Sequence, residues 1–336
     1  MNSNQPLKPE RLMQMAWGYA PPLIIEAAVQ NKVFDLLEAS PKTIPELAAA
    51  SGASERGLTA ILNALVGIQL LTRDGQRYSL TPESAAFLVS NKPGSLARFF
   101  SHVSTMLIPS WLHLTETAKT GKPAVAVNDK TKGAAFFADF VESLFPLSYP
   151  AARMLGEHLG VNKAASPVSV LDLAAGSGVW GIALAQLSPK VTVTAVDWPD
   201  VLEITKKVAK QQGVGDRLKT SPGDLLAADF GKGHQVATLG HILHSEGRER
   251  SRKLLRKTFE ALAPGGTIAI MEFLPNEERT GPPDALIFAV NMLTMTETGD
   301  TYPFGEISGW LKEAGFVNPR LLEVPAVSPL VLATRP

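Results

Sequence analysis

The stretch Val168-Ser-Val-Leu-Asp-Leu-Ala-Ala-Gly-Ser-Gly-Val-Trp-Gly-Ile-Ala-Leu-Ala185 decides the fold of this chain. It begins with an apolar run, residues 168–173, that is typical of a buried strand. It then turns through residues 174–178 and continues with the apolar spacing of a helix. A buried strand that turns sharply into a helix creates a nucleotide crevice at the strand's carboxyl end. Gly176 and Gly178 have no Cβ, so a ligand can lie against their backbone.

A second apolar run, residues 191–196, ends at Asp197, which lies 25 residues after Asp172. An acid at this place can accept hydrogen bonds from both hydroxyls of a ribose. The glycines leave two interpretations open. Residues 176–181 fit the dinucleotide fingerprint Gly-x-Gly-x-x-Gly, which is typical of NAD-dependent oxidoreductases that would use Gly176, Gly178 and Gly181. The preceding acid gives Asp-x-x-x-Gly-x-Gly, which resembles the first motif of class I S-adenosylmethionine-dependent methyltransferases.

Composition limits the class of protein. The 336 residues are enough for two or three domains, and the 45% apolar content allows a large core. Lys plus Arg and Asp plus Glu number 32 each, and this balance argues against a nucleic-acid partner. The absence of cysteine excludes disulfides and thiolate metal sites. We find no pattern for a metal site, no signal peptide and no membrane-spanning run, so we expect a cytoplasmic protein without a membrane partner.

The N-terminal part predicts a winged helix. Residues 11–38 indicate two helices that are separated by Pro21-Pro22. Thr43-Ile-Pro-Glu46 is a capping box, and Ser54 begins another helix. Residues 70–80 then predict a hairpin that turns at Asp74-Gly75. A winged helix binds DNA or serves as a dimerisation module, and the second role is favoured because the candidate recognition helix has one basic residue near its start.

Residues 82–160 indicate further helices, rich in aromatic residues, and a polar linker leads to Val168. From there strands and helices alternate, which predicts a Rossmann-like α/β domain with a parallel sheet and one antiparallel strand. We therefore expect a dimerisation domain at residues 1–100, a helical linker and substrate-pocket region at 101–163, and a cofactor-binding catalytic domain at 164–336. The expected strands are residues 168–173, 191–196, 217–221, 235–240, 267–273, 320–324 and 329–334, with a helix at 308–314.

Polar residues follow the later strands. Asp224 comes after the third strand and can accept the adenine amino group while Leu225 packs on the ring; a helix-capping role for Asp224 stays equally open. His241 and His244 follow the fourth strand, and the fifth strand ends at Glu272. A phenol has a pKa of about 10, so an imidazole with a pKa of about 6.5 can take its proton as it attacks.

These residues together resemble the caffeic-acid and acetylserotonin O-methyltransferase-like enzymes over nearly the whole chain. The resemblance rests on the Gly176/Gly178 turn, Asp197, Gly223-Asp224, His244, Ala263-Pro-Gly-Gly266 and Glu272. It implies a homodimer, S-adenosyl-L-methionine as cofactor and a small-molecule acceptor. His244 matches the family's base, and Glu272 matches the acid that orients it; His241 does not align with that motif. The implied cofactor-binding residues are Asp172, Gly176, Gly178, Asp197, Trp198, Asp224 and Leu225.

The chain departs from the family around the base. Ser245-Glu246 replaces the usual Asp-Trp, Gly240 replaces a lysine of plant members, and Thr301 stands where a second acid is expected. Methyl transfer to carbon, and a relative that binds the cofactor without methylating, therefore remain alternatives beside the preferred hydroxyl of an aromatic or polyketide-like metabolite. An oxidoreductase lacks support because no Tyr-x-x-x-Lys dyad is present, and the neutral charge argues against a ligand-sensing regulator. We expect the substrate pocket to be lined by Phe145, Tyr149, Met292 and Met295.

Overall fold

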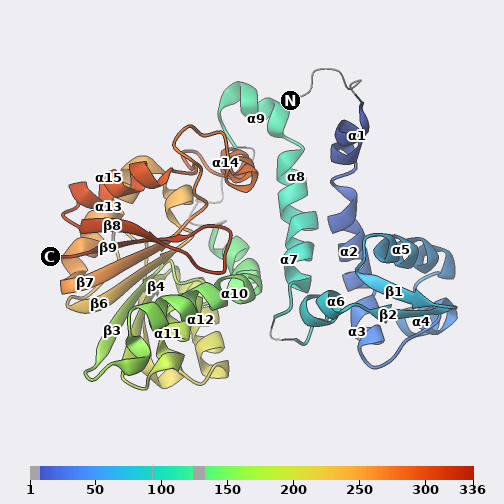
Figure 1. Ribbon diagram of the computed structural model, residues 1–336, viewed down its shortest axis with the longest axis horizontal. Helices are drawn as coiled ribbons and strands as arrows, with labels where there is room; N and C mark the ends of the chain where they lie inside the picture. The colour runs from blue at the N-terminus through green and yellow to red at the C-terminus, as the bar shows by residue number, and fades with distance from the viewer. Residues whose placement is uncertain (1–7, 93, 124–132) are drawn as a thin grey trace. The chain divides into compact units, whose positions relative to one another are not determined.

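The chain divides into two compact units, Met1–Pro109 and Ser110–Pro336. The computed structural model describes residues 8–92, 94–123 and 133–336, with residues 133–140 described by their backbone alone (Figure 1). Every helix within these residues is too short or too polar to span a bilayer. The division of the chain at residues 100 and 163 stays a prediction.

The first unit is mainly helical and encloses a hydrophobic core that includes Phe34, Leu47, Leu62 and Tyr78. Its helices and strands are α1 (Glu10–Ala16), α2 (Ala20–Gln30), α3 (Val33–Glu38), α4 (Ile44–Ser51), α5 (Glu55–Gly67), β1 (Leu71–Asp74), β2 (Arg77–Leu80), α6 (Pro82–Phe87) and α7 (Ala97–His102). The π-helical turn Val103–Leu107 joins α7 to α8 (Ile108–Trp111).

The predicted winged-helix elements are present in this unit. Thr43 and Glu46 form the capping box at the start of α4, and the Ser54 hydroxyl accepts the Gly57 N–H at the start of α5. Strands β1 and β2 form the hairpin, in which Asp74 pairs with Arg77. Helix, helix and hairpin thus follow one another as the sequence predicts.

The prediction of two helices in residues 11–38 is wrong, because the structure has three. Pro21 and Pro22 lie in the first turn of α2, where a missing N–H costs nothing, so they begin a helix and do not end one. Lys32 adopts the left-handed conformation at φ 55° and separates α2 from α3. Local backbone conformation at one lysine therefore creates the additional break.

The second unit is built on a seven-stranded sheet in the order β5-β4-β3-β6-β7-β9-β8. Strand β9 runs antiparallel to both neighbours and the other pairs are parallel, which confirms the expected sheet. The strands are β3 (Val168–Leu173), β4 (Val191–Asp197), β5 (Leu218–Pro222), β6 (His234–Gly240), β7 (Leu262–Met271), β8 (Val317–Leu322) and β9 (Leu330–Thr334).

Helices cover both faces of this sheet, so the sheet lies between two apolar layers (Figure 1). On one face lie α10 (Gly133–His158), α11 (Val179–Leu187) and α12 (Pro199–Gln211). On the other lie α13 (Leu243–Ala261) and α15 (Phe304–Glu313). The remaining helices of the unit are α9 (Leu114–Thr120) and α14 (Pro283–Met295).

Some element boundaries differ from the predicted ones. Strand β7 starts five residues earlier than predicted, at Leu262, and ends at Met271, so Glu272 directly follows it. Helix α15 begins at Phe304 where residue 308 was predicted. Helix α13 includes His244 in its first turn and has a kink at Gly247 (φ 74°, ψ 165°). His244 is therefore carried by a helix turn and not by a loop.

Candidate active site

Asp172, on strand β3, positions the turn that follows this strand through hydrogen bonds. This carboxylate is fully buried; its Oδ2 accepts the Gly181 N–H at 2.9 Å, and its Oδ1 accepts the Thr238 hydroxyl at 2.7 Å. Burial raises the pKa of Asp172 to about 7. Asp172 is buried, and both of its carboxylate oxygens accept hydrogen bonds from protein groups. It therefore orients the first turn of α11 and is not available to a ligand.

The backbone of the turn is left-handed at three positions, Ala174, Gly176 and Gly178, and two of them are glycines. Gly176 has φ 55° and Gly178 has φ 78°. A Cβ at Gly178 would lie 2.8 Å from the Thr205 methyl group. The Thr205 hydroxyl donates to the Gly176 carbonyl at 2.6 Å, so α12 and the turn hold each other in place.

Asp197 at the end of β4 closes this turn from the neighbouring strand. Its Oδ2 accepts the Gly176 N–H at 2.9 Å, and its Oδ1 accepts the Trp198 N–H at 2.7 Å. Each carboxylate oxygen keeps a second lone pair for a ligand. Burial raises the pKa of Asp197 to about 6, against the lowering effect of these two hydrogen bonds.

Asp224 lies in a turn after β5 and has protein partners on both oxygens. Its Oδ1 accepts the Leu226 N–H at 2.9 Å, and its Oδ2 lies 2.9 Å from Arg250 Nη2. Arg250 also binds Glu246 at 2.6 Å, and thereby joins this turn to α13. The side chain of Leu225 packs in the hydrophobic core. The structural role of Asp224 is thus clear, while contact of either residue with adenine stays a prediction.

Trp180 packs beneath the ends of the strands, and the sequence interpretation missed it. It is buried in the first turn of α11, and its indole nitrogen lies against Gly240 at the end of β6. A Cβ at residue 240 would collide with the indole ring. The glycine that replaces the lysine of plant relatives is therefore required by the neighbouring tryptophan.

His244 and Glu272 form a buried pair at the ends of β6 and β7. His244 Nδ1 lies 2.7 Å from Glu272 Oε2, and Oε1 accepts the N–H groups of Leu243 at 2.7 Å and His244 at 3.3 Å. Burial opposes ionisation of Glu272, but the charge and hydrogen bonds of His244 outweigh it and hold the pKa of the carboxyl below its usual value. Glu272 can therefore stay ionised beside the imidazole.

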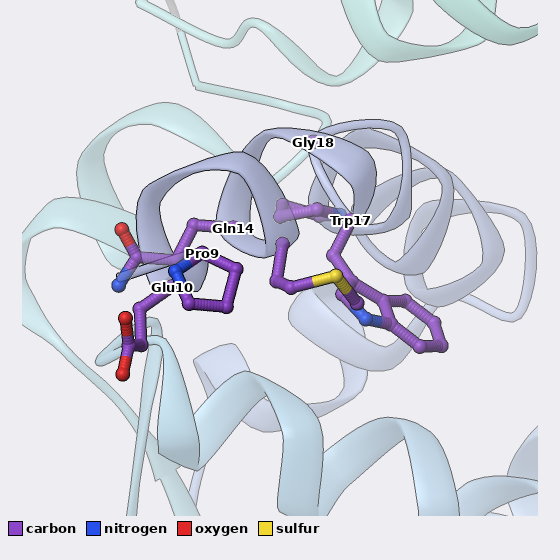
Figure 2. A pocket seen from close by; sticks show the side chains of 7 residues that line it. Pro9, Glu10, Gln14, Trp17 and Gly18 are labelled. Carbon is purple, nitrogen blue, oxygen red and sulfur yellow. The ribbon is translucent and has the colours of Figure 1, made fainter. Parts of the chain in front are cut away.

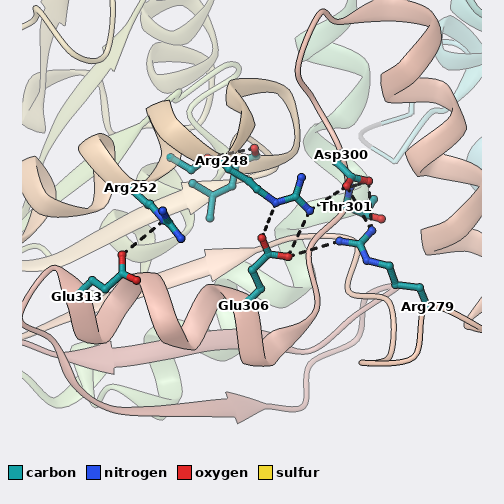
Figure 3. A network of polar contacts seen from close by, with 9 residues as sticks. Arg248, Arg252, Arg279, Asp300, Thr301, Glu306 and Glu313 are labelled. Carbon is teal, nitrogen blue, oxygen red and sulfur yellow. Dashed lines mark hydrogen bonds and ion pairs between the residues drawn. The ribbon is translucent and has the colours of Figure 1, made fainter. Parts of the chain in front are cut away.

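The His244 turn is also held from its other side. The Asp300 N–H donates to the His244 carbonyl at 2.9 Å. The Asp300 carboxylate belongs to an ion-pair network with Arg248 and Arg279, each 3.3 Å away, and both arginines also reach Glu306 (Figure 3). This network links the kink of α13 to the start of α15 and fixes the segment that supports His244.

Two phenylalanines enclose the histidine, and neither was predicted. Phe288 meets the His244 ring edge to face with centroids 4.9 Å apart, and Phe273 stacks on Phe288 at 3.9 Å. Phe273 directly follows Glu272, and Phe288 lies one helical turn before Met292 on α14. Adjacency to the predicted acid and i, i+4 spacing from a predicted pocket residue were the available signals.

The four predicted substrate residues fall into two groups. Met292 and Met295 are buried on α14, the helix that carries Phe288. Phe145 and Tyr149 stack on each other at 5.4 Å on α10. The Tyr149 hydroxyl donates to Gln186 near the end of α11, at the opposite end of that helix from the glycine turn. These contacts pack α10 against α11, and contact of Phe145 or Tyr149 with an acceptor stays a prediction.

His241 joins the same site from the end of β6. One ring nitrogen each of His241 and His244 and one oxygen of Glu272 lie within 4.8 Å of one another. Such a donor set also suits a divalent metal ion. The His241 ring lies 5.1 Å from Phe273, and burial lowers the pKa of the imidazole to about 4 against the opposite effect of Glu272. His241 is therefore neutral near pH 7.

All these groups lie at one edge of the sheet, because β4, β3, β6 and β7 are parallel neighbours. The turn after β3 and Asp197 form one half of this edge. His241, His244 and Glu272 form the other half. Ligands of open α/β sheets bind at this edge, where the strands end and the connections change direction. The edge can thus place a nucleotide-like cofactor beside a base.

Comparisons with known proteins agree with this arrangement. Residues 155–317 match the model of the O-methyltransferase domain, and residues 13–90 match the O-methyltransferase dimerisation domain. The 3-hydroxy-5-methyl-1-naphthoate 3-O-methyltransferase of Streptomyces sahachiroi is 29% identical, over 91% of this chain and 89% of its own length. The L-tyrosine C(3)-methyltransferase of Streptomyces lavendulae is 24% identical, over 98% of this chain and 94% of its own length.

The fold is also similar to solved structures. A crystal structure from Nostoc punctiforme PCC 73102 superimposes with a TM-score of 0.88 and 29% sequence identity. The match covers 98% of this chain and 100% of the other one. The likeness therefore extends over both compact units.

Proposed function

The chain belongs to the S-adenosylmethionine-dependent O-methyltransferase family, and from this premise we propose how its crevice carries out methyl transfer. We propose that the acceptor is the hydroxyl group of a small aromatic or polyketide-like metabolite. The naphthoate substrate in the name of the Streptomyces sahachiroi relative supports this class. The aromatic enclosure of His244 by Phe273 and Phe288 supports it as well, because aromatic rings pack favourably on one another.

The turn after β3 fits the cofactor. Gly176 and Gly178 leave the backbone open, and Asp197 keeps acceptor sites for the two ribose hydroxyls. Asp172 acts as a positioning residue beneath the turn. Asp224, Leu225 and Trp198 are proposed to surround the adenine. S-adenosylmethionine, when bound, supplies the electrophilic methyl group.

His244 is proposed to be the general base. Because Glu272 faces Nδ1, that nitrogen carries the proton, and the lone pair of Nε2 is left for the acceptor hydroxyl. The acceptor hydroxyl would give its proton to Nε2 during the transfer, and the carboxylate of Glu272 would stabilise the resulting imidazolium. Phe288 and Phe273 provide apolar surroundings beside the imidazole.

The buried His244–Glu272 pair, with its separation of 2.7 Å, is the observation that carries this proposal. The test is to incubate the protein with S-adenosylmethionine and a panel of phenols, naphthols and hydroxynaphthoates. Mass spectrometry should show a methylated product for members of the panel. Products from none of the phenolic compounds, in a protein that binds the cofactor, would contradict the proposed acceptor class.

Transfer to carbon is the second candidate. Ser245-Glu246 replaces the usual pair after the base, and one relative is named as an L-tyrosine C(3)-methyltransferase. A cofactor with a ¹³C-labelled methyl group distinguishes the two reactions. Nuclear magnetic resonance of the product would show whether the labelled carbon is attached to oxygen or to a ring carbon.

We further propose that two copies associate through the first unit. Leu12, Met13, Met15, Trp17 and Tyr19 are exposed large apolar side chains on or next to α1. Met13 and Trp17 line a shallow hollow there, together with Pro9, Gln14, Gly18 and Pro21 (Figure 2). An apolar surface of this kind marks an interaction site, and it lies next to and partly within the matched dimerisation domain. The cytoplasmic location stays a prediction.

A further inference from the structure

His241 has an unusual backbone and an unsatisfied side chain. Its φ is 61°, a left-handed conformation that is uncommon outside glycine. Its N–H donates to the Met271 carbonyl at 2.8 Å, which ties the strained residue to the end of β7. Strain of this kind persists only where the surroundings hold it, often at functional sites.

The imidazole of His241 has an unused hydrogen-bonding group. Its Nδ1 is buried and has no hydrogen-bond partner among the residues that the structure describes. Buried polar groups normally have hydrogen-bond partners, because leaving one unpaired destabilises the fold. The ring packs beside Phe273 and His244, with centroids 5.1 and 6.2 Å away, so that the three rings form one cluster. It is therefore ordered within the acceptor side of the crevice without a protein group to bond.

The distance between the two histidines suits two neighbouring oxygens. A ring nitrogen of each lies within 4.8 Å of the other, and a hydrogen bond adds about 2.8 Å of reach to each nitrogen. Oxygens on adjacent carbons of one aromatic ring can thus be contacted one by each imidazole. Glu272 holds His244, while Nδ1 of His241 has no partner to give up within the described part of the chain.

We propose that His241 is a specificity-determining residue, which makes a hydrogen bond to a second oxygen beside the hydroxyl that His244 deprotonates. The preferred acceptors then carry two neighbouring oxygens on an aromatic ring. This inference rests on the proposed function, because it uses the assignment of His244 as the base. His241 touches the acceptor but takes no proton in the transfer.

The test compares 2,3-dihydroxynaphthalene, with neighbouring hydroxyls, and 2-naphthol, with one hydroxyl. Their dissociation constants are measured by calorimetry on the full chain saturated with S-adenosylhomocysteine. A chelator is present, so that a metal ion on His241, His244 and Glu272 cannot contribute. The parent should bind the diol about tenfold more tightly, the worth of one additional hydrogen bond.

His241→Phe keeps a ring of similar shape without nitrogens and should reduce the ratio of the two affinities to below about twofold. His241→Asn serves as a second variant, because asparagine tolerates the left-handed backbone; its shorter side chain should also lower the ratio. His158→Phe, the same substitution at an exposed position of α10, is the control and should leave the ratio unchanged. Comparing ratios removes the intrinsic difference between the two probes.

The inference would be overturned if the parent bound both probes with equal affinity, or if it bound neither of them. An unchanged ratio in the His241 variants would also overturn it. Methyl transfer to either probe is recorded separately as the check on the proposed function. Transfer without an effect of His241 on the ratio contradicts this inference alone, whereas an effect on the ratio without transfer contradicts the proposed reaction alone.

Discussion

The carboxylate of Glu272 binds His244 at both its side chain and its backbone. Oε2 lies 2.7 Å from Nδ1, while Oε1 accepts the His244 N–H and the N–H of the preceding leucine. One buried acid at the end of β7 therefore fixes both the tautomer of the imidazole and the helix turn that carries it. This relationship makes the roles of the two residues separable by substitution.

His244→Ala should lower kcat by about 10²–10⁴, the usual contribution of a positioned base. Glu272→Gln should lower it less, because glutamine can still bond the turn but cannot stabilise the imidazolium. Both variants should bind S-adenosylhomocysteine like the parent, since neither residue belongs to the half of the crevice formed by the glycine turn. Calorimetry and single-turnover rates check this. Full turnover of His244→Ala would favour a carbon-centred or already ionised acceptor.

Asp197→Ala should weaken S-adenosylhomocysteine binding by about 5–150-fold, which corresponds to about 1–3 kcal/mol for lost ribose contacts. The variant also loses the acceptor of the Gly176 N–H, so the turn itself should loosen. Asp200→Ala, at an exposed acid in the first turn of α12, is the matched control. If Asp197→Ala binds S-adenosylhomocysteine as tightly as the parent, the ribose does not bind at the end of β4.

Cofactor affinity should depend on pH through Asp197. The ionised form accepts the ribose hydroxyls, and burial raises the pKa of this carboxyl to about 6. Affinity is therefore present above pH 6 and is lost as the pH falls through this value, by about tenfold at pH 5. Calorimetry with S-adenosylhomocysteine from pH 5 to 8 measures the profile. Asp197→Asn cannot titrate, and a profile in this variant as steep as in the parent would assign the effect to another group.

Gly178→Ala should destabilise the fold by about 1–3 kcal/mol, because alanine would adopt a strained φ and press against Thr205. Gly213→Ala is the matched control: its φ is 73°, but a Cβ there meets nothing within 4 Å. This control should show the cost of backbone strain alone. Denaturant unfolding of both variants gives the comparison, and equal losses would show that the close contact with Thr205 is relieved without cost.

Association of two copies should depend on the exposed face of α1. Met13→Glu combined with Trp17→Glu places two charges in the hollow of Figure 2 and should convert a dimer to a monomer. Met154→Glu, at an exposed methionine of α10, is the control. Analytical ultracentrifugation at micromolar concentration measures the mass of the parent and of each variant in solution. A parent protein that is monomeric under these conditions contradicts the proposed homodimer.

The sequence by itself determined the features that depend on neighbouring residues. The apolar runs predicted the central strands β3, β4, β6 and β7, because a buried parallel strand needs a largely continuous apolar segment. Asp172, Gly176 and Gly178 were recognisable since the strand, the turn and the helix that they connect are contiguous. The capping box at Thr43 and the hairpin at Asp74-Gly75 follow from local hydrogen bonding in the same way.

Only the tertiary structure decided how distant segments meet. Phe288 reaches His244, and Asp300 supports its carbonyl, because α14 and the following segment pack against α13, which carries His244. The pairing of Asp224 with Arg250 and the unpartnered nitrogen of His241 likewise depend on which helix lies beside which strand end. Spacing along a chain identifies the strand that carries a side chain, but its contacts arise from packing between elements far apart in sequence. For that reason the base and its acid were predictable, while the groups that enclose them were not.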